Sequence, residues 1–454
     1  MSRTTPPVTA EPPERSRAAG PSAAPAVKVP YPGIGSVFGS RECEAVRETV
    51  LFGRTLSAGE RRAEFESRFA EHLGRRHAFS VTSGTVALEF ALHLLDLRPG
   101  DEVIATPQTY LATVQPLLGK DVTVRFADVL PESLNIDPRR VEELVNDRTR
   151  AIVLVHYGGH PADMAALRRI AERHGLLIVE DCAHALGTTD AGRPAGARGD
   201  LACFSFHSSK NISTLGEGGM VAFDRDAWAE RLSRIRANEP DADHVPAPHA
   251  FGDSAGPAAG ALYPGLAYTH DCVTLRHPGT NATLSEPAAA VGTVQLERLP
   301  ELVGRRRSIA ARLTEVLDGV EGIRVPRVPD GAEHSYHLFT FFVEPGGPVS
   351  RQELLDQLAA DGVQTYLRYF PLHLLPEWRL RGHRYGECPT AERLWFEQHM
   401  NLPCHPSLSD GQVDCLAASL ERALHGRPAM RGSPVLRGSP APSSTPALHG
   451  TGAG

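Results

Sequence analysis

Residues 176–184 read LLIVEDCAH, and residues 201–211 read LACFSFHSSKN. Each stretch begins with a nearly continuous apolar run, which is typical of a strand that is buried on both faces of a parallel sheet. Asp181 closes the first run, and Lys210 lies in a loop after the second. Because the carboxyl ends of strands face the ligand crevice of an open α/β sheet, both side chains are candidates for one site.

Further strand and helix patterns alternate around these two runs. The strand patterns cover residues 101–105, 123–129, 151–156 and 219–223, and the helical patterns cover residues 86–95, 138–145, 162–174 and 227–237. This alternation predicts an α/β fold whose large domain has a mostly parallel sheet flanked by helices.

The C-terminal part of the sequence has a different pattern. We expect one long helix over about 285–317, strands at 336–343 and 363–369, and helices near 351–360 and 410–424. This pattern predicts a smaller α+β C-terminal domain, so the expected division is 29–300 and 301–426. Residues 1–28 and 427–454 are rich in Pro, Ala and Ser and are predicted to be disordered tails. The Pro/Gly-rich stretch 239–280 is interpreted as a possible lid over a substrate.

Composition excludes several classes of protein. The 454 residues include 47 Lys and Arg against 54 Asp and Glu, a net charge of −7, which gives no basic surface for nucleic acid or an anionic membrane. The apolar runs are far shorter than the roughly 20 residues of a spanning helix. Seven scattered cysteines without a C-x-x-C pair favour reduced thiols and no metal site. With no apolar signal segment at the N-terminus, we expect a cytoplasmic protein.

Two more motifs lie beside strand patterns. Residues 82–85 (TSGT) precede a helical pattern, where small residues can either bind a phosphate or simply cap the helix. Tyr110 follows the strand pattern at 101–105, so its ring can stack on a flat ligand or pack as an ordinary core tyrosine. Taken alone, Asp181 can be a helix cap and Lys210 a solvated surface group. Taken together, the four features meet the needs of pyridoxal 5′-phosphate: a lysine, a carboxylate for the ring nitrogen and a phosphate cup.

These residues resemble the pyridoxal-phosphate-dependent sugar aminotransferases of the DegT/StrS type, which have the aspartate-aminotransferase-like fold, type I of the pyridoxal-phosphate-dependent transferases. The resemblance covers roughly residues 30–426. The motifs that carry it lie at residues 83–88, 100–104, 156–159, 180–184, 204–211, 216–219, 281 with 284–286, 295–299, 371–373 and 402–407.

The resemblance implies a role for each candidate residue around the cofactor ring. Lys210 would be the lysine that forms the Schiff base, and Asp181 would pair with the pyridinium nitrogen. Tyr110 would stack on the ring, and His184 would lie near the phenolic oxygen of the ring.

The resemblance also implies the residues that hold the phosphate. Gly84, Thr85 and Ser205 would bind it from the same chain. Asn281 would reach the phosphate of the neighbouring subunit, which implies a homodimer with shared active sites. Residues 282–283 are Ala-Thr where the family often has an aromatic and a basic residue.

The activity implied by the resemblance is transfer of an amino group from glutamate or glutamine to a ketone. The acceptor would be a nucleotide-linked keto sugar or a keto-cyclitol, in the biosynthesis of an antibiotic, another natural product or a polysaccharide. One alternative is a dehydratase on the same fold, but there a histidine replaces the lysine that stands here as Lys210. The other is a non-catalytic scaffold or sensor, which normally carries an added DNA-binding domain that the stretch before residue 30 is too short to hold.

Overall fold

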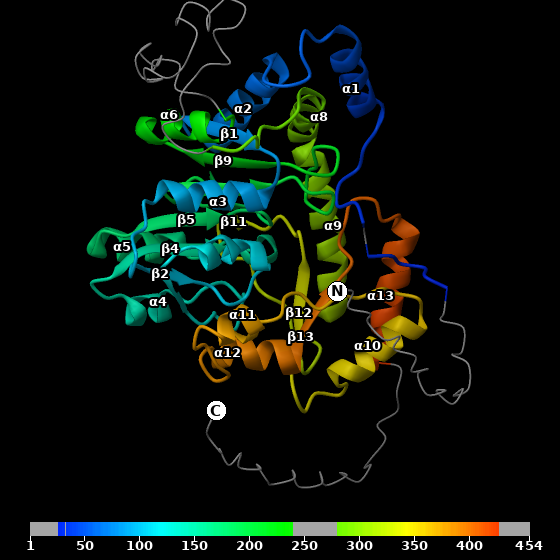
Figure 1. Ribbon diagram of the computed structural model, residues 1–454. Helices are drawn as coiled ribbons and strands as arrows, with labels where there is room; N and C mark the ends of the chain where they lie inside the picture. The colour runs from blue at the N-terminus through cyan, green and yellow to red at the C-terminus, as the bar shows by residue number, and fades with distance from the viewer. Residues whose placement is uncertain (1–25, 32, 239–278, 426–454) are drawn as a thin grey trace, which may run out of the picture.

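A computed structural model describes residues 26–31, 33–238 and 279–425 (Figure 1). Apart from residues 26–28 and 279–280, the predicted tails and the predicted lid lie outside the described residues. Within the described part of the chain, no helix is both long enough and apolar enough to cross a membrane.

A seven-stranded sheet organises the larger part of the chain (Figure 1). Its strand order is β1-β9-β8-β5-β4-β2-β3, and the neighbours from β3 to β8 are parallel, whereas β9 and β1 are antiparallel at one edge. The α/β fold with a mostly parallel sheet is therefore confirmed. The strands are β1 (His77–Val81), β2 (Glu102–Ala105), β3 (Thr123–Phe126), β4 (Thr149–Val155), β5 (Leu177–Asp181), β8 (Leu201–Ser205) and β9 (Gly219–Phe223).

Helices cover both faces of this sheet because alternate strand residues are apolar on each side. Val153 and Val179 face the core that contains α3 and α6, whereas Ile152 and Ile178 face the core that contains α4 and α5. The flanking helices are α2 (Glu60–Leu73), α3 (Gly84–Leu94), α4 (Pro138–Leu144), α5 (Met164–His174), α6 (Asp226–Ile235) and α8 (Glu286–Glu297). The helix α1 (Ser40–Phe52) packs against α8.

A second core surrounds a three-stranded sheet with the order β10-β12-β13. The helix α9 contributes to both cores, since Leu302 packs with the large sheet and Leu313 with the small one. The elements of this part are α9 (Leu299–Leu317), β10 (Ile323–Arg324), β12 (Phe339–Val343), α10 (Arg351–Ala360), β13 (His399–Leu402) and α13 (Asp410–His425). The short helices α11 (Pro376–Arg379) and α12 (Pro389–Arg393) lie between them in the sequence, but their Trp378 and Ala391 belong to a core of the large sheet. Short strands β6 (Thr189–Asp190), β7 (Arg193–Pro194) and β11 (Ala332–Glu333) form a third sheet.

Two predictions for the C-terminal part are wrong. The single helix expected over 285–317 is two helices that meet at Arg298, where Pro300 in the first turn of α9 supplies no N–H to continue a hydrogen-bond ladder. In place of the strand expected at 363–369, the described residues show a single bridge, between Val363 and Val29. The later backbone groups of this stretch bond to side chains instead: the Arg368 N–H donates to Asn401 Oδ1 at 3.0 Å.

Candidate active site

A cavity of about 570 Å³ opens at the carboxyl ends of β5 and β8, beside the N-terminus of α3. Seven of the eight residues predicted for the site line it. These are Gly84, Thr85, Tyr110, Asp181, His184, Ser205 and Lys210. The topology explains their convergence, because β5 and β8 are parallel neighbours that end at the same edge of the sheet.

Lys210 lies in the loop that follows β8, where its N–H donates to the carbonyl of His207 at 2.8 Å. The amine sits inside the cavity, and this burial lowers the pKa of Lys210 to about 8, while Asp181 acts to raise it and Arg368 to lower it. A pKa of about 8 leaves about a tenth of the amines neutral at pH 7. The lysine is thus able to act as a nucleophile or a base near neutral pH.

Asp181 is the last residue of β5, and its carboxylate is buried. Its Oδ2 accepts a hydrogen bond from Thr113 Oγ1 at 2.7 Å, and its Oδ1 accepts one from the Ala183 N–H at 3.0 Å. Burial raises the pKa of Asp181, and these two bonds and the positive charge of Lys210 counteract that rise. A cation bound beside the carboxylate would oppose this rise in pKa and favour the ionised side chain.

The TSGT motif at residues 82–85 caps the helix α3 and also leaves a polar surface at its N-terminus that can bind a phosphate. Ser83 is the N-cap, because its Oγ accepts a hydrogen bond from the Val86 N–H at 3.2 Å. Gly84 opens the helix against Ser205, and a Cβ placed on Gly84 would lie 2.6 Å from the Cβ of Ser205. Only glycine therefore allows this approach of helix and strand. The helix N-terminus, Thr85 and Ser205 together form a concave polar surface that suits a phosphate.

His184 is buried, and its ring is nearly parallel to two neighbouring rings. It lies 5.7 Å from Tyr369 with an interplanar angle of 6°, and 4.4 Å from His337 with an angle of 19°. Burial holds the pKa of His184 well below its usual range, so its imidazole is neutral. Its Nε2 lies 3.2 Å from the Tyr369 hydroxyl, whereas its Nδ1 is buried with no partner among the described residues.

These features fit pyridoxal phosphate. A buried nitrogen of His184 is left without a partner, and the close approach at Gly84 leaves space at the helix N-terminus. Lys210 and Asp181 line the same cavity, which has room for a planar ring and its phosphate. Tyr110, with half of its surface exposed, lies on the cavity wall with its ring 5.8 Å from that of Tyr369.

Asn281 is the predicted residue that does not line this cavity. It is exposed and forms a backbone bridge with Ala237 near the end of α6. Its predicted contact with the phosphate of a neighbouring subunit stays a prediction.

Sequence reasoning missed Thr113, Arg368 and Tyr369. The first is three residues beyond Tyr110 in a 3₁₀ turn, and nothing in the local sequence indicates its bond to Asp181. The other two fall in the stretch 363–369, which was interpreted as a strand. The available signal was the sequence YLRYF at 366–370, an arginine among aromatic residues immediately before the motif at 371–373.

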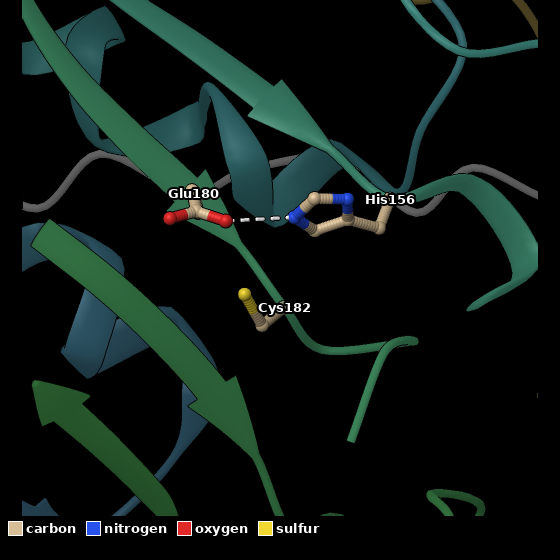
Figure 2. A group of neighbouring side chains, drawn as sticks. All are labelled: His156, Glu180 and Cys182. Carbon is tan, nitrogen blue, oxygen red and sulfur yellow. Dashed lines mark hydrogen bonds and ion pairs between the residues drawn. The ribbon is translucent and has the colours of Figure 1, made fainter. Parts of the chain in front are cut away.

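A second cluster of chemistry-bearing side chains lies next to Asp181. Glu180, His156 and Cys182 have ligand atoms within 4.8 Å of one another, and all three side chains are buried (Figure 2). Glu180 Oε2 accepts from His156 Nε2 at 2.9 Å and from the Gly196 N–H at 2.9 Å. Its Oε1 accepts from the N–H groups of residues 198 and 199.

The carboxylate and the imidazole of this cluster already bind partners within the protein, so the cluster does not suit a metal ion. His156 Nδ1 accepts from the Ala162 N–H at 3.0 Å, which occupies the second ring nitrogen. Burial raises the pKa of the Cys182 thiol well above its usual range and disfavours the thiolate that a metal requires. The cluster instead ties the end of β4 and the 196–199 loop to the strand that carries Asp181.

The Glu180→Gln variant is expected to lose about 3 kcal/mol of unfolding free energy, because an amide group would face donors that now bind a carboxylate. The hydrogen bonds, led by that from His156, outweigh burial and lower the pKa of Glu180 to about 2. A lowered folded-state pKa gives stability above the unfolded value near 4.5, and this stability is lost as pH falls toward 2. Urea unfolding at pH 7 and pH 3 measures both effects.

The matched control is Glu344→Gln, which removes an exposed carboxylate paired with Arg324 at 3.1 Å. We expect it to change the unfolding free energy by less than about 1 kcal/mol. Equal losses in the two variants would contradict a structural role for the buried cluster.

The chain is similar to known proteins over most of its length. The family model described as the DegT/DnrJ/EryC1/StrS aminotransferase family matches residues 38–421. The dTDP-3-amino-3,4,6-trideoxy-alpha-D-glucose transaminase of Streptomyces venezuelae is 35% identical over 373 residues, which cover 82% of this chain and 89% of that protein. The spore coat polysaccharide biosynthesis protein SpsC of Bacillus subtilis is 33% identical over 396 residues, covering 86% and 96%. The crystal structure of DesV from S. venezuelae, in complex with a ketimine intermediate, has a TM-score of 0.72 and 33% identity, covering 85% of this chain and 94% of that one.

Proposed function

Because the chain belongs to the DegT/DnrJ/EryC1/StrS aminotransferase family, we propose that it transfers the amino group of glutamate or glutamine to the ketone of a nucleotide-linked sugar. The protein is a pyridoxal-phosphate-dependent aminotransferase, as its family and its structural relatives are. When bound, pyridoxal phosphate supplies an electron-accepting ring that stabilises negative charge at the α-carbon of the donor.

The observation that carries the proposal is the placement of Lys210 and Asp181 in one cavity. Asp181 would hold a proton on the ring nitrogen, because an adjacent carboxylate favours the protonated form. Lys210 would anchor the cofactor and, as a free amine, would act as the base and acid that moves the proton of the donor α-carbon. The N-terminus of α3 would hold the phosphate, and Tyr110 would lie against the ring. A dehydratase of the kind that replaces the lysine by histidine is disfavoured by Lys210.

The relatives support an amino-sugar product. One acts as a transaminase for a dTDP-linked amino sugar, and another takes part in the biosynthesis of a spore coat polysaccharide. Antibiotic or polysaccharide amino-sugar biosynthesis is therefore the proposed setting. A keto-cyclitol is the rival acceptor, which only the second half of the reaction distinguishes.

The two half-reactions test the proposal separately. Adding L-glutamate or L-glutamine to the cofactor-loaded enzyme without an acceptor should remove the visible absorption band of the cofactor within one turnover. A dTDP-linked keto sugar should then restore the band, and a keto-inositol should restore it more slowly. Initial rates should give the parallel double-reciprocal lines of ping-pong kinetics. A band that no amino acid changes would contradict the proposal.

We also propose a homodimer with shared active sites. An apolar surface at the end of α1 supports it, because Val50, Leu51, Phe52 and Leu56 are each more than half exposed. Exposed apolar groups in such a cluster are typical of protein interfaces. Asn281 does not line the cavity of its own chain, which leaves it available to a neighbouring subunit. Light scattering should give about twice the chain mass of 48.9 kDa, and a mass near 48.9 kDa would exclude the dimer.

A further inference from the structure

The sequence GIGSVFG at residues 33–39 has no role in the site described above. Its third residue, Gly35, lies against the loop at residues 207–213, here called the lysine loop, and the Gly35 N–H donates to the carbonyl of Ser208 at 2.7 Å. A Cβ placed on Gly35 would lie 2.7 Å from the carbonyl oxygen of Lys210, closer than a real side chain allows. The segment that contains Gly35 is therefore packed directly on the backbone that carries the reactive lysine.

Arg306 of α9 binds the carbonyl of the same glycine (Figure 1). It is the largest of the fully buried side chains in the described chain. Its Nη2 donates to the carbonyl of Gly35, and its Nη1 donates to the carbonyls of Tyr336, at 3.0 Å, and Cys404. One guanidinium thus joins three segments that are far apart in the sequence: the 33–39 segment, the turn before β12 and the residues after β13.

The guanidinium of Arg306 has no acidic partner. Among the residues that the structure describes, no carboxylate acts on it, and burial lowers the pKa of Arg306 to about 10. A buried cation without a counter-charge costs free energy. Only a guanidinium offers five N–H groups in a fixed planar fork, which lets it bind several carbonyls at once. Its presence at this cost indicates a function that depends on where the bound carbonyls lie.

A second buried side chain joins the 33–39 segment to the lysine loop. Gln295 of α8 accepts hydrogen bonds at Oε1 from the Ser36 hydroxyl and from the Ser213 N–H. Its Nε2 donates to the Val37 carbonyl at 3.1 Å. The backbone from Gly35 to Val37 is thus fixed by α8, by α9 and by the lysine loop itself.

We propose that Arg306 is a positioning residue for Lys210, which it holds in place through the contact of Gly35 with the lysine loop; this inference rests on the assignment of Lys210 in the proposed function. The charges that act on the pKa of Lys210 are those of Asp181 and Arg368, and that of Arg306 is not among them. The effect is therefore geometric, since Arg306 sets where the amine lies and not how readily it loses its proton. A displacement of the amine by about 1 Å is enough to lower the rate of bond formation about 10²-fold.

The test compares two forms of the cofactor on the cofactor-free protein. Pyridoxal phosphate forms a covalent link to the lysine, whereas pyridoxamine phosphate occupies the same cavity without one. Arg306→Met should lower the rate at which pyridoxal phosphate gives the visible absorption band at least about tenfold. It should change the Kd of pyridoxamine phosphate, measured by calorimetry, less than about threefold. Arg306→Lys should recover part of the rate.

The control for the arginine variants is Arg305→Met. Arg305 is the neighbouring residue on α9, but it donates to the Leu408 carbonyl at 2.8 Å and pairs with Asp410. It has no contact with Gly35 among those of the described residues, so this variant should keep the wild-type rate and Kd.

A pair of glycine variants keeps the test independent of the folding of Arg306→Met. Gly35→Ala adds one methyl group, which would displace the carbonyls of the lysine loop. It should therefore slow the appearance of the band at least about tenfold and leave the Kd of pyridoxamine phosphate within about threefold of wild type. Gly33→Ala is the matched control, because a Cβ there would have no described atom within 4 Å, and it should behave as wild type.

The outcomes that contradict the inference differ from those that contradict the proposed function. A rate within about threefold of wild type in Gly35→Ala or in a folded Arg306→Met would overturn the inference. Equal losses of this rate and of pyridoxamine phosphate affinity would also overturn it, because the two residues would then shape the whole cavity. A wild-type protein that gains the band but reacts with no amino donor would refute the proposed function alone.

Discussion

Lys210→Ala is expected to lower kcat/KM for amino transfer at least about 10³-fold, because it removes both the covalent anchor of the cofactor and the group that moves the proton. Lys210 is the only lysine among the described residues that line the cavity, so no neighbour can replace it. The variant should also lack the visible absorption band that depends on the covalent link. Steady-state kinetics and absorption spectra of the purified variant measure the two effects.

The control for this variant is Lys120→Ala, which removes a lysine at the end of a 3₁₀ turn away from the cavity. It should keep the wild-type kcat/KM and spectrum.

The pH dependence of the wild-type enzyme tests the same assignment. Because the neutral amine is the reactive form and its pKa is about 8, the rate of cofactor uptake by the cofactor-free protein should fall as pH decreases below 8. A Lys210→Ala enzyme with activity within tenfold of wild type would refute the assignment.

Asp181→Asn is expected to lower kcat by about 10²–10³-fold, which is the loss typical of removing one preorganised electrostatic partner. The amide has nearly the same shape but no charge, so it no longer favours the protonated ring nitrogen. The backbone bond from Ala183 can persist to the amide oxygen, so folding should be little affected. Single-turnover kinetics with L-glutamate and thermal unfolding separate the chemical effect from a structural one.

Thr113→Val tests the same site more gently. It removes the 2.7 Å hydrogen bond to Asp181 Oδ2 but keeps the carboxylate. We expect a decrease in kcat of about tenfold, since one hydrogen bond to a charged group contributes about 1.5–3 kcal/mol at most. If Asp181→Asn were no more damaging than Thr113→Val, the charge of Asp181 would not be the basis of its role.

The central sheet and the residues at its edge could be predicted because their signals are local. The runs before Asp181 and Lys210 are apolar over nearly their full length, and only a strand buried on both faces requires that composition. Because the two strands are parallel neighbours, their carboxyl ends lie at the same edge of the sheet. The same logic does not apply to β1 (His77–Val81), a short antiparallel edge strand that the sequence analysis did not identify.

The part of the site contributed by residues 366–369 could not be predicted, because its conformation depends on distant side chains. Gln108 donates its amide N–H to the Tyr369 carbonyl at 2.6 Å, and Asn401 accepts from Arg368. These hydrogen bonds replace those of a paired strand. The pattern of apolar and polar residues in the sequence does not indicate them. The same is true at Arg298, where α8 ends and α9 begins although the helical pattern of the sequence continues without interruption.

The helix α9 connects the two cores. Its first turns are fixed against the large sheet by Leu302, and its last turns carry Leu313 in the small core. At 1.5 Å per residue, its 19 residues extend about 28 Å. A tilt of about 5° around its first turn would displace the far end by about 2.5 Å, which exceeds the tolerance of a hydrogen bond. A hydrogen bond between the two parts of the molecule, such as that from the Tyr157 hydroxyl to the Arg368 carbonyl, is therefore kept only while this helix keeps its inclination.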